Sequence, residues 1–520
     1  MSSVEALQLW GFEGCEAPED LLRRTMRGEV TGVSLFRHFN VDSPRQVRDL
    51  TDSLQEAAGG RELLIAIDQE GGQLRALAGS TPFAGNLALG AVDDVGLTRR
   101  VAAAIGTELR AVGVNVNYAP VADVITQPDN PSLGVRSFGG DPHLVARHVE
   151  ASVQGLRDAS VLSVVKHFPG KGEASVDPHH GLPVLDVDES RLNEVEFVPF
   201  AAALHAGVDG AMVGHYALPR ITGLDDLPAS LSSRIIGGLL RHGLGFDGLV
   251  ITDALDMKAL AQGGASLIEA VAALRAGTDL LLSTADYERS VGLDEGLRHA
   301  FGRGLLHADS IEASASRIQS ALRRTHRTSI PQVDAVGSSS HLQLAAELAR
   351  RSITLVRDSG LLPLVPTTRI ASIMVRPLDL TPADTSSGDE PALADALRTH
   401  FQATTELVVG YRPLPEEIAA AVEAAREADV VVVGTITATP EQAELVRAVA
   451  AERPVVTAAL RTPFDLSSYP EVETHLCTYS VLRPSLDALA SVLVGRRAEG
   501  TLPVAIGSLY RLGHGLGGAV

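Results

Sequence analysis

Residues 161 to 183 read VLSVVKHFPGKGEASVDPHHGLP. The first five residues are apolar or small, which is typical of a strand buried on both faces of a parallel sheet. From Lys166 onward the stretch carries two Lys, three His, an Asp and a Glu, together with three Pro and three Gly. So many Pro and Gly exclude a helix interior or a central strand. The stretch therefore predicts a core strand that runs directly into a restrained loop of ionisable groups.

Seven further apolar runs of similar length occur on both sides of this strand. They cover residues 5–10, 31–36, 62–68, 113–118, 209–214, 248–252 and 278–283. Segments with apolar residues at helical spacing lie between them and include 43–57, 142–159 and 232–245. Ser43 is a good N-cap and Pro44 suits a first helical position. Eight strands alternating with helices predict an α/β fold with a TIM-like (β/α)₈ barrel over residues 1–330. An open, doubly wound sheet is the competing architecture.

A second α/β pattern follows the barrel region. Residues 312–327 predict its last helix, and the Ser- and Gly-rich residues 331–341 predict a linker. Strand-like runs then cover 353–358, 370–375, 405–410, 429–436 and 454–460, and helix-like runs cover 392–401, 416–428, 441–452 and 485–495. They predict a smaller α/β layered sandwich domain over residues 342–520. No G-x-G-x-x-G motif follows its first strand, and no G-x-x-x-x-G-K-[ST] motif occurs anywhere in the chain, so nucleotide binding has no support.

Composition excludes several classes of protein. The net charge of the 520 residues is −20, which argues against a nucleic-acid-binding surface. Cys15 and Cys477 are far apart and are expected to be unpaired thiols, as in a reducing compartment. The N-terminus lacks the pattern of a signal peptide, and no apolar run approaches about 18 residues. We therefore expect a cytoplasmic protein with no membrane or nucleic-acid partner.

Ionisable and amide side chains recur where the predicted strands end. The set comprises Asp68, Asn117, Asp123, Lys166, His167, His215 and Asp253. Singly, each has an ordinary explanation: Asp253 can cap a helix, and His215 can be a hydrogen-bonded rim residue. Lys166 and Asp123 can form a structural ion pair. Because the carboxyl ends of barrel strands meet on one face, where active sites are built, the whole set favours a catalytic site.

The loop after Lys166 lies over this same face. Asp177 and His179 are two residues apart, so an extended backbone would place both on one side. A carboxylate beside an imidazole fixes the tautomer and orients the ring, which makes His179 a candidate general acid/base. The next residue, His180, should then point away from the side that Asp177 and His179 share. A metal site built from these residues and His167 is the rival interpretation, and it is disfavoured because adjacent His residues rarely bind one ion.

Six motifs follow one another along the barrel region. They are IDQEGG (67–72), NVNYAPVADV (115–124), RSFGGDP (136–142), VVKHFPGKG with DPHHGLP (164–172 and 177–183), MVGHYALP (212–219) and GFDGLVITDALDMKAL (245–260). In type and order they resemble glycoside hydrolase family 3, and within it the bacterial β-N-acetylglucosaminidases of the two-domain type. The K-H-F-P-G loop and the G-F-D-G-x-V-x-[ST]-D segment are the most specific of these signals. Residues 342–520 resemble, more loosely, the α/β sandwich that follows the barrel in two-domain members.

The resemblance implies a role for each matching position. Asp253 would be the nucleophile of a retaining glycosidase, and His179, held by Asp177, would be the general acid/base. The substrate-binding residues would be Asp68, Arg75, Arg136, Lys166, His167 and His215. The implied reaction is the exo-acting release of terminal GlcNAc, with a cell-wall fragment of the muropeptide type as natural substrate. No metal or organic cofactor is implied.

The sequence departs from the family pattern at two places. The family usually has an arginine at the position of Ala76, whereas Arg75 lies one residue earlier and is expected to aim differently. The loop usually reads G-H-G-D-T and D-S-H, whereas Lys171, Glu173 and Pro178 stand in this chain. The added positive charge and the longer acid are expected to affect specificity. The three catalytic positions are intact.

Three other functions stay open at this point. A β-N-acetylglucosaminide phosphorylase is compatible with the motifs, because a His acid/base does not repel phosphate as a carboxylate would. A β-glucosidase of the same family is a second alternative. A sugar-binding protein without turnover is a third, of a different class. The oligomeric state is not indicated by the sequence.

Overall fold

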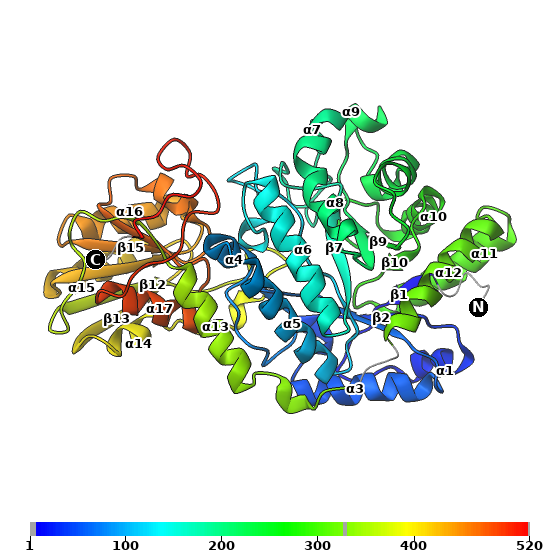
Figure 1. Ribbon diagram of the computed structural model, residues 1–520, viewed down its shortest axis with the longest axis horizontal. Coiled ribbons are helices and arrows are strands. Elements are labelled where there is room, and N and C mark those ends of the chain that lie inside the picture. Colours follow the sequence, from blue (N-terminus) through cyan, green and yellow to red (C-terminus); the bar gives the residue numbers. More distant parts are fainter. Residues whose placement is uncertain (1–6, 326–329, 518–520) are drawn as a thin grey trace.

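The computed structural model describes residues 7–325 and 330–517, which form a barrel and a second, sheet-containing unit beside it (Figure 1). Within these residues, eight parallel strands close the barrel in the order β1-β10-β9-β8-β7-β6-β3-β2. The strands are β1 (Gln8–Trp10), β2 (Gly32–Leu35), β3 (Leu64–Ile67), β6 (Val116–Asn117), β7 (Leu162–Phe168), β8 (Gly210–Val213), β9 (Leu249–Ala254) and β10 (Leu280–Leu282). Each overlaps one of the eight predicted runs, and the predicted (β/α)₈ barrel is confirmed.

Helices surround the barrel. The longer ones are α1 (Glu19–Arg27), α3 (Pro44–Ala57), α5 (Val95–Ala111), α6 (Pro142–Asp158), α8 (Phe197–His205), α10 (Ser266–Ala276), α11 (Tyr287–Gly302) and α12 (Ala308–Thr325). Short helices are α2 (Arg37–Asn40), α4 (Asn86–Val92), α7 (Glu189–Arg191) and α9 (Pro219–Thr222). The predicted start of α3 is confirmed, because the Gln46 amide donates to the Ser43 hydroxyl at 3.3 Å.

Three local features differ from the sequence prediction. The segment expected to be α-helical over 232–245 is a π-helix over Arg234–Gly243, where two adjacent glycines relax the preference for the tighter α-helical turn. Lys166 to Phe168, expected in a loop, belong to β7, whose pairing with β8 shifts register after Val165. The IDQEGG motif continues into a ribbon of β4 (Gln69–Gly71) and β5 (Leu74–Arg75) that the apolar pattern does not reveal.

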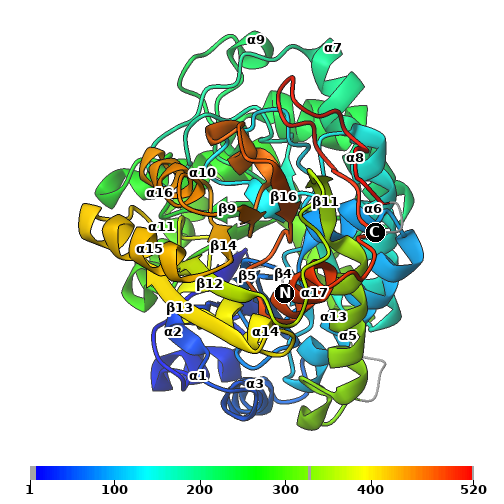
Figure 2. The same ribbon diagram turned by 90° about the vertical axis from the view of Figure 1, so that its left-hand side faces the viewer.

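The second unit is a six-stranded sheet in the order β11-β16-β15-β14-β12-β13. Its strands are β11 (Thr354–Arg357), β12 (Arg369–Val375), β13 (Ala403–Val409), β14 (Val430–Thr435), β15 (Val455–Ala459) and β16 (Thr474–Cys477). Its helices are α13 (Ser339–Ser352), α14 (Leu393–Arg398), α15 (Pro415–Glu427), α16 (Pro440–Ala450) and α17 (Arg483–Leu493). Figure 2 shows α15 and α16 on one side of the sheet and α13 and α17 on the other. The predicted layered α/β domain is confirmed, although β16 was not predicted.

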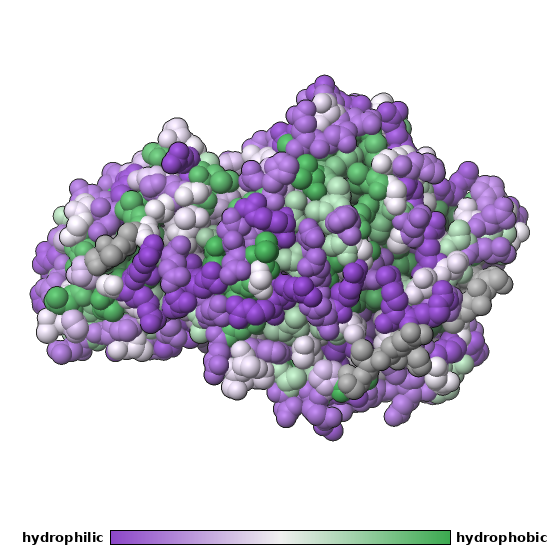
Figure 3. Space-filling view, viewed as in Figure 1, coloured by the Kyte–Doolittle hydropathy of each residue, from purple (hydrophilic) through white to green (hydrophobic). Residues whose placement is uncertain are grey.

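The chain passes from the barrel to the second unit between α12 and α13. Helix α12 ends at Thr325, and α13 begins at Ser339, inside the segment expected to be a linker. The domain division at residues 331–341 stays a prediction. The face of the molecule in Figure 3 is largely hydrophilic, in keeping with the net charge of −20. Among the described residues, no helix combines the length and apolar character needed to cross a membrane.

Candidate active site

The carboxyl ends of four barrel strands bring most of the predicted polar residues to one face. Asp68 directly follows β3, and Asn117 ends β6. Lys166 and His167 lie near the end of β7, and Asp253 lies near the end of β9. Because all barrel strands are parallel, these ends point the same way. The expected clustering on one barrel face is present.

The cluster has an accessible layer and a buried layer. Asp68, His179 and Asp253 are partly exposed. The buried members behind them are Glu70, Asp123, Arg136, Lys166, His167, Lys171 and Asp177. In the described part of the chain, no group of three or more His, Cys, Asp or Glu side chains is arranged to hold a metal ion. The side chains of the accessible layer are the most exposed to a substrate. The buried layer determines their protonation and the orientation of their side chains.

Glu70 is the centre of the buried layer, and sequence reasoning did not single it out. Its carboxylate accepts two hydrogen bonds from Arg136, at 2.8 and 2.9 Å, and pairs with Lys166 Nζ at 2.6 Å. Burial alone would raise the pKa of Glu70, but the charges of Arg136 and Lys166 outweigh it and hold this pKa far below its ordinary value. Lys166 Nζ also donates to Asp68 at 2.5 Å. The only signal for Glu70 in the sequence was its place two residues after Asp68 in the IDQEGG motif.

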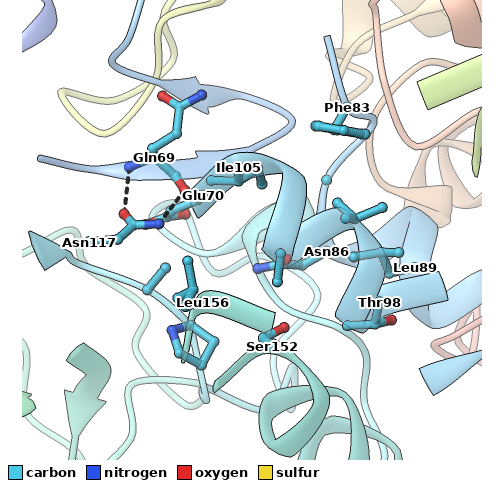
Figure 4. A pocket seen from close by; sticks show the side chains of 15 residues that line it. Gln69, Glu70, Phe83, Asn86, Leu89, Thr98, Ile105, Asn117, Ser152 and Leu156 are labelled. Atoms are coloured by element: carbon cyan, nitrogen blue, oxygen red, sulfur yellow. Dashed lines mark hydrogen bonds between the residues drawn. The ribbon is translucent and has the colours of Figure 1, made fainter. Parts of the chain in front are cut away.

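Asn117 fixes the backbone on which Asp68 and Glu70 lie (Figure 4). Its side-chain oxygen accepts from the Gln69 amide at 3.0 Å, and its side-chain nitrogen donates to the Gln69 carbonyl at 2.9 Å. A cavity of about 30 Å³ lies behind this contact and is lined by Glu70 and by side chains of α4, α5 and α6. Asn117 therefore positions the backbone that carries the sugar-binding candidate Asp68 and the buried Glu70.

His167 is held as a neutral ring. Its Nδ1 donates to Asp123 Oδ2 at 2.7 Å, so Nε2 carries the lone pair. Arg136 and Lys171 each approach Nε2 at 3.5 Å. Burial, followed by the charges of Lys171 and Arg136, holds the pKa of His167 well below its ordinary value. The hydroxyl of Tyr216 donates to the His167 carbonyl and so fixes the backbone as well.

Asp177 and His179 form the expected pair, although not in an extended segment. His179 Nδ1 donates to Asp177 Oδ1 at 2.6 Å, and the His179 amide donates to the same oxygen at 3.0 Å. A turn through Pro178 makes this contact, since the His180 amide closes it onto the Asp177 carbonyl at 2.9 Å. Burial would raise the pKa of Asp177, but the hydrogen bonds and charge of His179, together with the charge of Lys171, outweigh burial and lower this pKa to about 2. His180 is exposed, as predicted.

The turn that carries His179 is docked on the segment that follows Asp253. The Ala259 amide donates to the Pro178 carbonyl at 3.0 Å. Burial would raise the pKa of Asp253, but its interactions with His167, His215, Lys171 and His179 together outweigh burial and lower this pKa to about 2. The Asp253 carboxylate thus lies within electrostatic reach of His179. Asp253 is part of β9, and the next long helix, α10, begins only at Ser266. The alternative that Asp253 caps a helix is therefore wrong.

Three interpretations of individual residues need correction. Arg75 binds Asp389 of the second unit at 2.5 Å and the Gly72 carbonyl at 3.1 Å, so its guanidinium is engaged by protein groups that the sequence analysis did not foresee. His215 is fully buried, and its ring contacts Ser230 at 2.7 Å and the Ala254 carbonyl at 3.1 Å. It supports the end of β9 instead of touching substrate.

The third correction concerns Lys166 and Asp123, which do not form the ion pair considered for them. Lys166 binds Asp68 and Glu70, whereas Asp123 binds His167. Lys166 reaches past β6 to the segment that follows β3, where Asp68 and Glu70 lie, whereas His167 meets Asp123, which follows β6.

The second unit reaches the site through the β4–β5 ribbon. The Thr385 amide and hydroxyl both donate to the Gln73 carbonyl, at 2.8 and 3.0 Å. The Arg75 amide donates to the Thr385 hydroxyl at 3.2 Å. Thr385 therefore lies beside the ribbon like a third strand, and the ribbon carries Glu70 at its other end.

Thr385→Val tests this contact, because it removes the hydroxyl and keeps the shape. We expect KM to rise severalfold with a smaller change in kcat, and the free energy of unfolding to fall by about 1 kcal/mol. Steady-state kinetics and denaturant unfolding measure the two effects. Thr405→Val, at an exposed position of β13 away from the barrel, is the matched control. An unchanged KM in Thr385→Val would show that the ribbon does not need this support.

Comparison with known proteins agrees with the geometry. The model of the glycosyl hydrolase family 3 N-terminal domain matches residues 8–321. The chain belongs to glycoside hydrolase family 3. The match runs from β1 into α12, and it includes every residue of the site that the barrel itself contributes.

Named relatives align over half or nearly all of this chain. β-Hexosaminidase A of Pseudoalteromonas piscicida is 30% identical, and the alignment covers 94% of this chain and 91% of that protein. β-Hexosaminidase LpqI of Mycobacterium bovis is 38% identical over 50% of this chain and 69% of its own length. The structure of a family 3 β-N-acetylglucosaminidase from Paenibacillus sp. superimposes with a TM-score of 0.91 at 36% identity, covering 96% of this chain and 97% of the other. The expected family 3 fold, with its second α/β unit, is confirmed.

Proposed function

We propose that this family 3 glycoside hydrolase is a retaining, exo-acting β-N-acetylglucosaminidase that releases terminal GlcNAc. The observation that carries the proposal is the Asp177–His179 pair, held at 2.6 Å and docked by its turn on the segment after Asp253. The names of the relatives, β-hexosaminidase and β-N-acetylglucosaminidase, support the same substrate class. A cell-wall fragment of the muropeptide type is the proposed natural substrate.

In the proposed first step, the Asp253 carboxylate attacks the anomeric carbon and forms a glycosyl ester. His179 gives the proton on Nε2 to the departing oxygen, since its Nδ1 proton is held by Asp177. In the second step, the neutral His179 takes a proton from water. That water attacks the anomeric carbon, and Asp253 leaves as a carboxylate. Asp177 stays ionised throughout and keeps the ring in one tautomer and orientation.

The sugar is proposed to be held by the accessible Asp68 and by the groups next to it. The Asp68 carboxylate accepts from sugar hydroxyls, and Lys166 Nζ holds one of its oxygens in place at 2.5 Å. His167 offers its Nε2 lone pair to a hydroxyl proton, which its neutral state permits. Arg136 acts mainly by pairing with Glu70, which leaves its guanidinium beside the His167 ring. Rigid placement of the sugar supplies part of the rate acceleration.

An aryl β-N-acetylglucosaminide and the matching β-glucoside, each in buffer with and without inorganic phosphate, test the proposal. We expect free GlcNAc with retained configuration, at least about tenfold faster turnover of the N-acetylglucosaminide, and no sugar phosphate. Glucosyl turnover alone would favour the β-glucosidase alternative, and a sugar 1-phosphate would favour the phosphorylase. Binding without turnover of either compound would contradict enzyme function.

We also propose a cytoplasmic location. Cys15 and Cys477 are both free thiols, one exposed and the other buried, as is usual in a reducing compartment. A cytoplasmic enzyme would act on fragments already released from the cell wall, which fits the proposed muropeptide substrate.

A further inference from the structure

Glu173 belongs to the loop that carries His179, and the proposed mechanism gives it no role. It is one of the positions at which the sequence departs from the family pattern. Its carboxylate accepts from Thr126 Oγ1 at 2.6 Å and from Gln127 Nε2 at 2.9 Å. Burial would raise the pKa of Glu173, but these two hydrogen bonds and the charge of Arg191 outweigh burial and lower this pKa. Glu173 is therefore an ionised tether to the segment that follows β6.

The neighbouring residues of the loop are fixed to the same segment through their backbone. The carbonyls of Lys171 and Gly172 accept from Asn130 Nδ2 at 2.8 and 3.2 Å. Gly172 lies so close to Val124 that a Cβ at this position would come within 1.7 Å of the Val124 carbonyl oxygen. Backbone packing and hydrogen bonds thus hold residues 170–174, which we call the loop base.

The loop base leads directly to the turn that carries the catalytic pair. Residues 175–176 are exposed, and they join the loop base to residues 177–181, which we call the catalytic turn. The catalytic turn has an anchor of its own, since the Ala259 amide donates to the Pro178 carbonyl at 3.0 Å. The placement of His179 therefore depends on the loop base as well as on the contact at Pro178.

We infer that Glu173 is a positioning residue for His179. Its hydrogen bonds with Thr126 and Gln127 hold the loop base against the segment after β6, and the loop base keeps the catalytic turn where His179 Nε2 can meet the departing oxygen. A displacement of about 1 Å in a catalytic group can cost roughly 10²-fold in rate. The nucleophile Asp253 lies on β9 and does not depend on this loop. The inference deepens the proposed function and rests on the role of His179 as general acid/base.

Glu173→Ala tests the tether with two classes of β-N-acetylglucosaminide. For an alkyl or sugar leaving group, kcat/KM should fall by roughly tenfold, because the proton donor is misplaced. For a dinitrophenyl leaving group, which needs no proton donor, kcat/KM should stay within about twofold of wild type. Glu189→Ala is the matched control, since it removes an exposed carboxylate on α7 and should leave both values unchanged.

Two further variants test the hydrogen bonds themselves. Glu173→Gln keeps an oxygen for Thr126 Oγ1 and offers its nitrogen to the side-chain oxygen of Gln127, so it should restore most of the wild-type kcat/KM. Thr126→Val removes one donor from the other side of the tether. It should reproduce part of the loss on its own and add nothing in the Glu173→Ala background, because the two residues act through one contact. Thermal unfolding of each variant checks the fold.

The outcomes separate this inference from the proposed function. An equal loss of kcat/KM for both leaving groups in Glu173→Ala would indicate a packing role and would overturn the inference, as would the absence of any loss. A loss in Glu173→Gln as large as that in Glu173→Ala, or additive effects of Glu173→Ala and Thr126→Val, would overturn it too. Absence of wild-type turnover, or equal leaving-group dependence in His179→Ala and wild type, would instead contradict the proposed function itself.

Discussion

Asp253→Asn is expected to lower kcat for an aryl β-N-acetylglucosaminide by at least about 10⁴-fold. The amide matches the carboxylate in shape but cannot attack the anomeric carbon or leave as an anion. The loss should persist with the most activated leaving groups, because the nucleophile acts before and after the departure of the aglycone. Mass spectrometry of the wild-type enzyme with a fluorinated substrate should show a glycosyl ester on the peptide that contains Asp253.

The matched control is Asp247→Asn. Asp247 is exposed and precedes the same strand, β9, at the opposite end of the barrel from Asp253. Its substitution removes one carboxylate from the same strand region and should leave kcat and KM unchanged. A label on a different carboxylate, or residual activity of Asp253→Asn above about 1% of wild type, would refute the assignment of the nucleophile.

His179→Ala is expected to have the second largest effect, and its size should depend on the leaving group. For a poor leaving group such as an alkyl or sugar alcohol, kcat/KM should fall by roughly 10²- to 10⁴-fold, because the departing oxygen then lacks its proton donor. For a dinitrophenyl leaving group the loss of kcat/KM should be far smaller. Plotting log kcat/KM against the leaving-group pKa should therefore give a much steeper slope for His179→Ala than for wild type.

His180→Ala is the control for that experiment. His180 is the exposed neighbour in the same turn, and its substitution should leave the slope unchanged. Added azide should restore turnover of the dinitrophenyl substrate by His179→Ala and give a β-glycosyl azide, since azide needs no general base. Equal slopes in His179→Ala and wild type would remove His179 from the mechanism.

The barrel could be predicted from the sequence because its strands are buried on both faces. Such strands read as short apolar runs, and the eight runs were enough to indicate closure. The ribbon over Gln69–Arg75 has no such run, because two adjacent glycines and polar side chains form it. β16 was missed for a related reason, since THLC is a short strand with a histidine inside it. Apolar periodicity detects burial, and it is silent where backbone pairing alone makes a strand.

The site could be predicted in part. The pairing of Asp177 with His179 followed from their spacing, although a turn and not an extended strand brings them together. Glu70 escaped attention because nothing local in the sequence indicates that Arg136 and Lys166 converge on it. Arg75 was assigned to the sugar because its true partner, Asp389, lies 314 positions away in the chain. Contacts between the two units cannot be predicted from individual sequence motifs.

The bond between Thr385 and the Gln73 carbonyl also constrains how this enzyme can be altered. The loop around Thr385 and the ribbon over Gln69–Arg75 are two distant parts of the chain that hydrogen bonds at Thr385 hold together. If the second unit were exchanged for that of a relative, the new unit would need a loop that makes the same contacts with the ribbon as the loop around Thr385. Mutations made only in the barrel to change selectivity would leave the Thr385 side of this contact unchanged. The unit that can be exchanged between relatives is therefore the barrel together with the segment around Thr385.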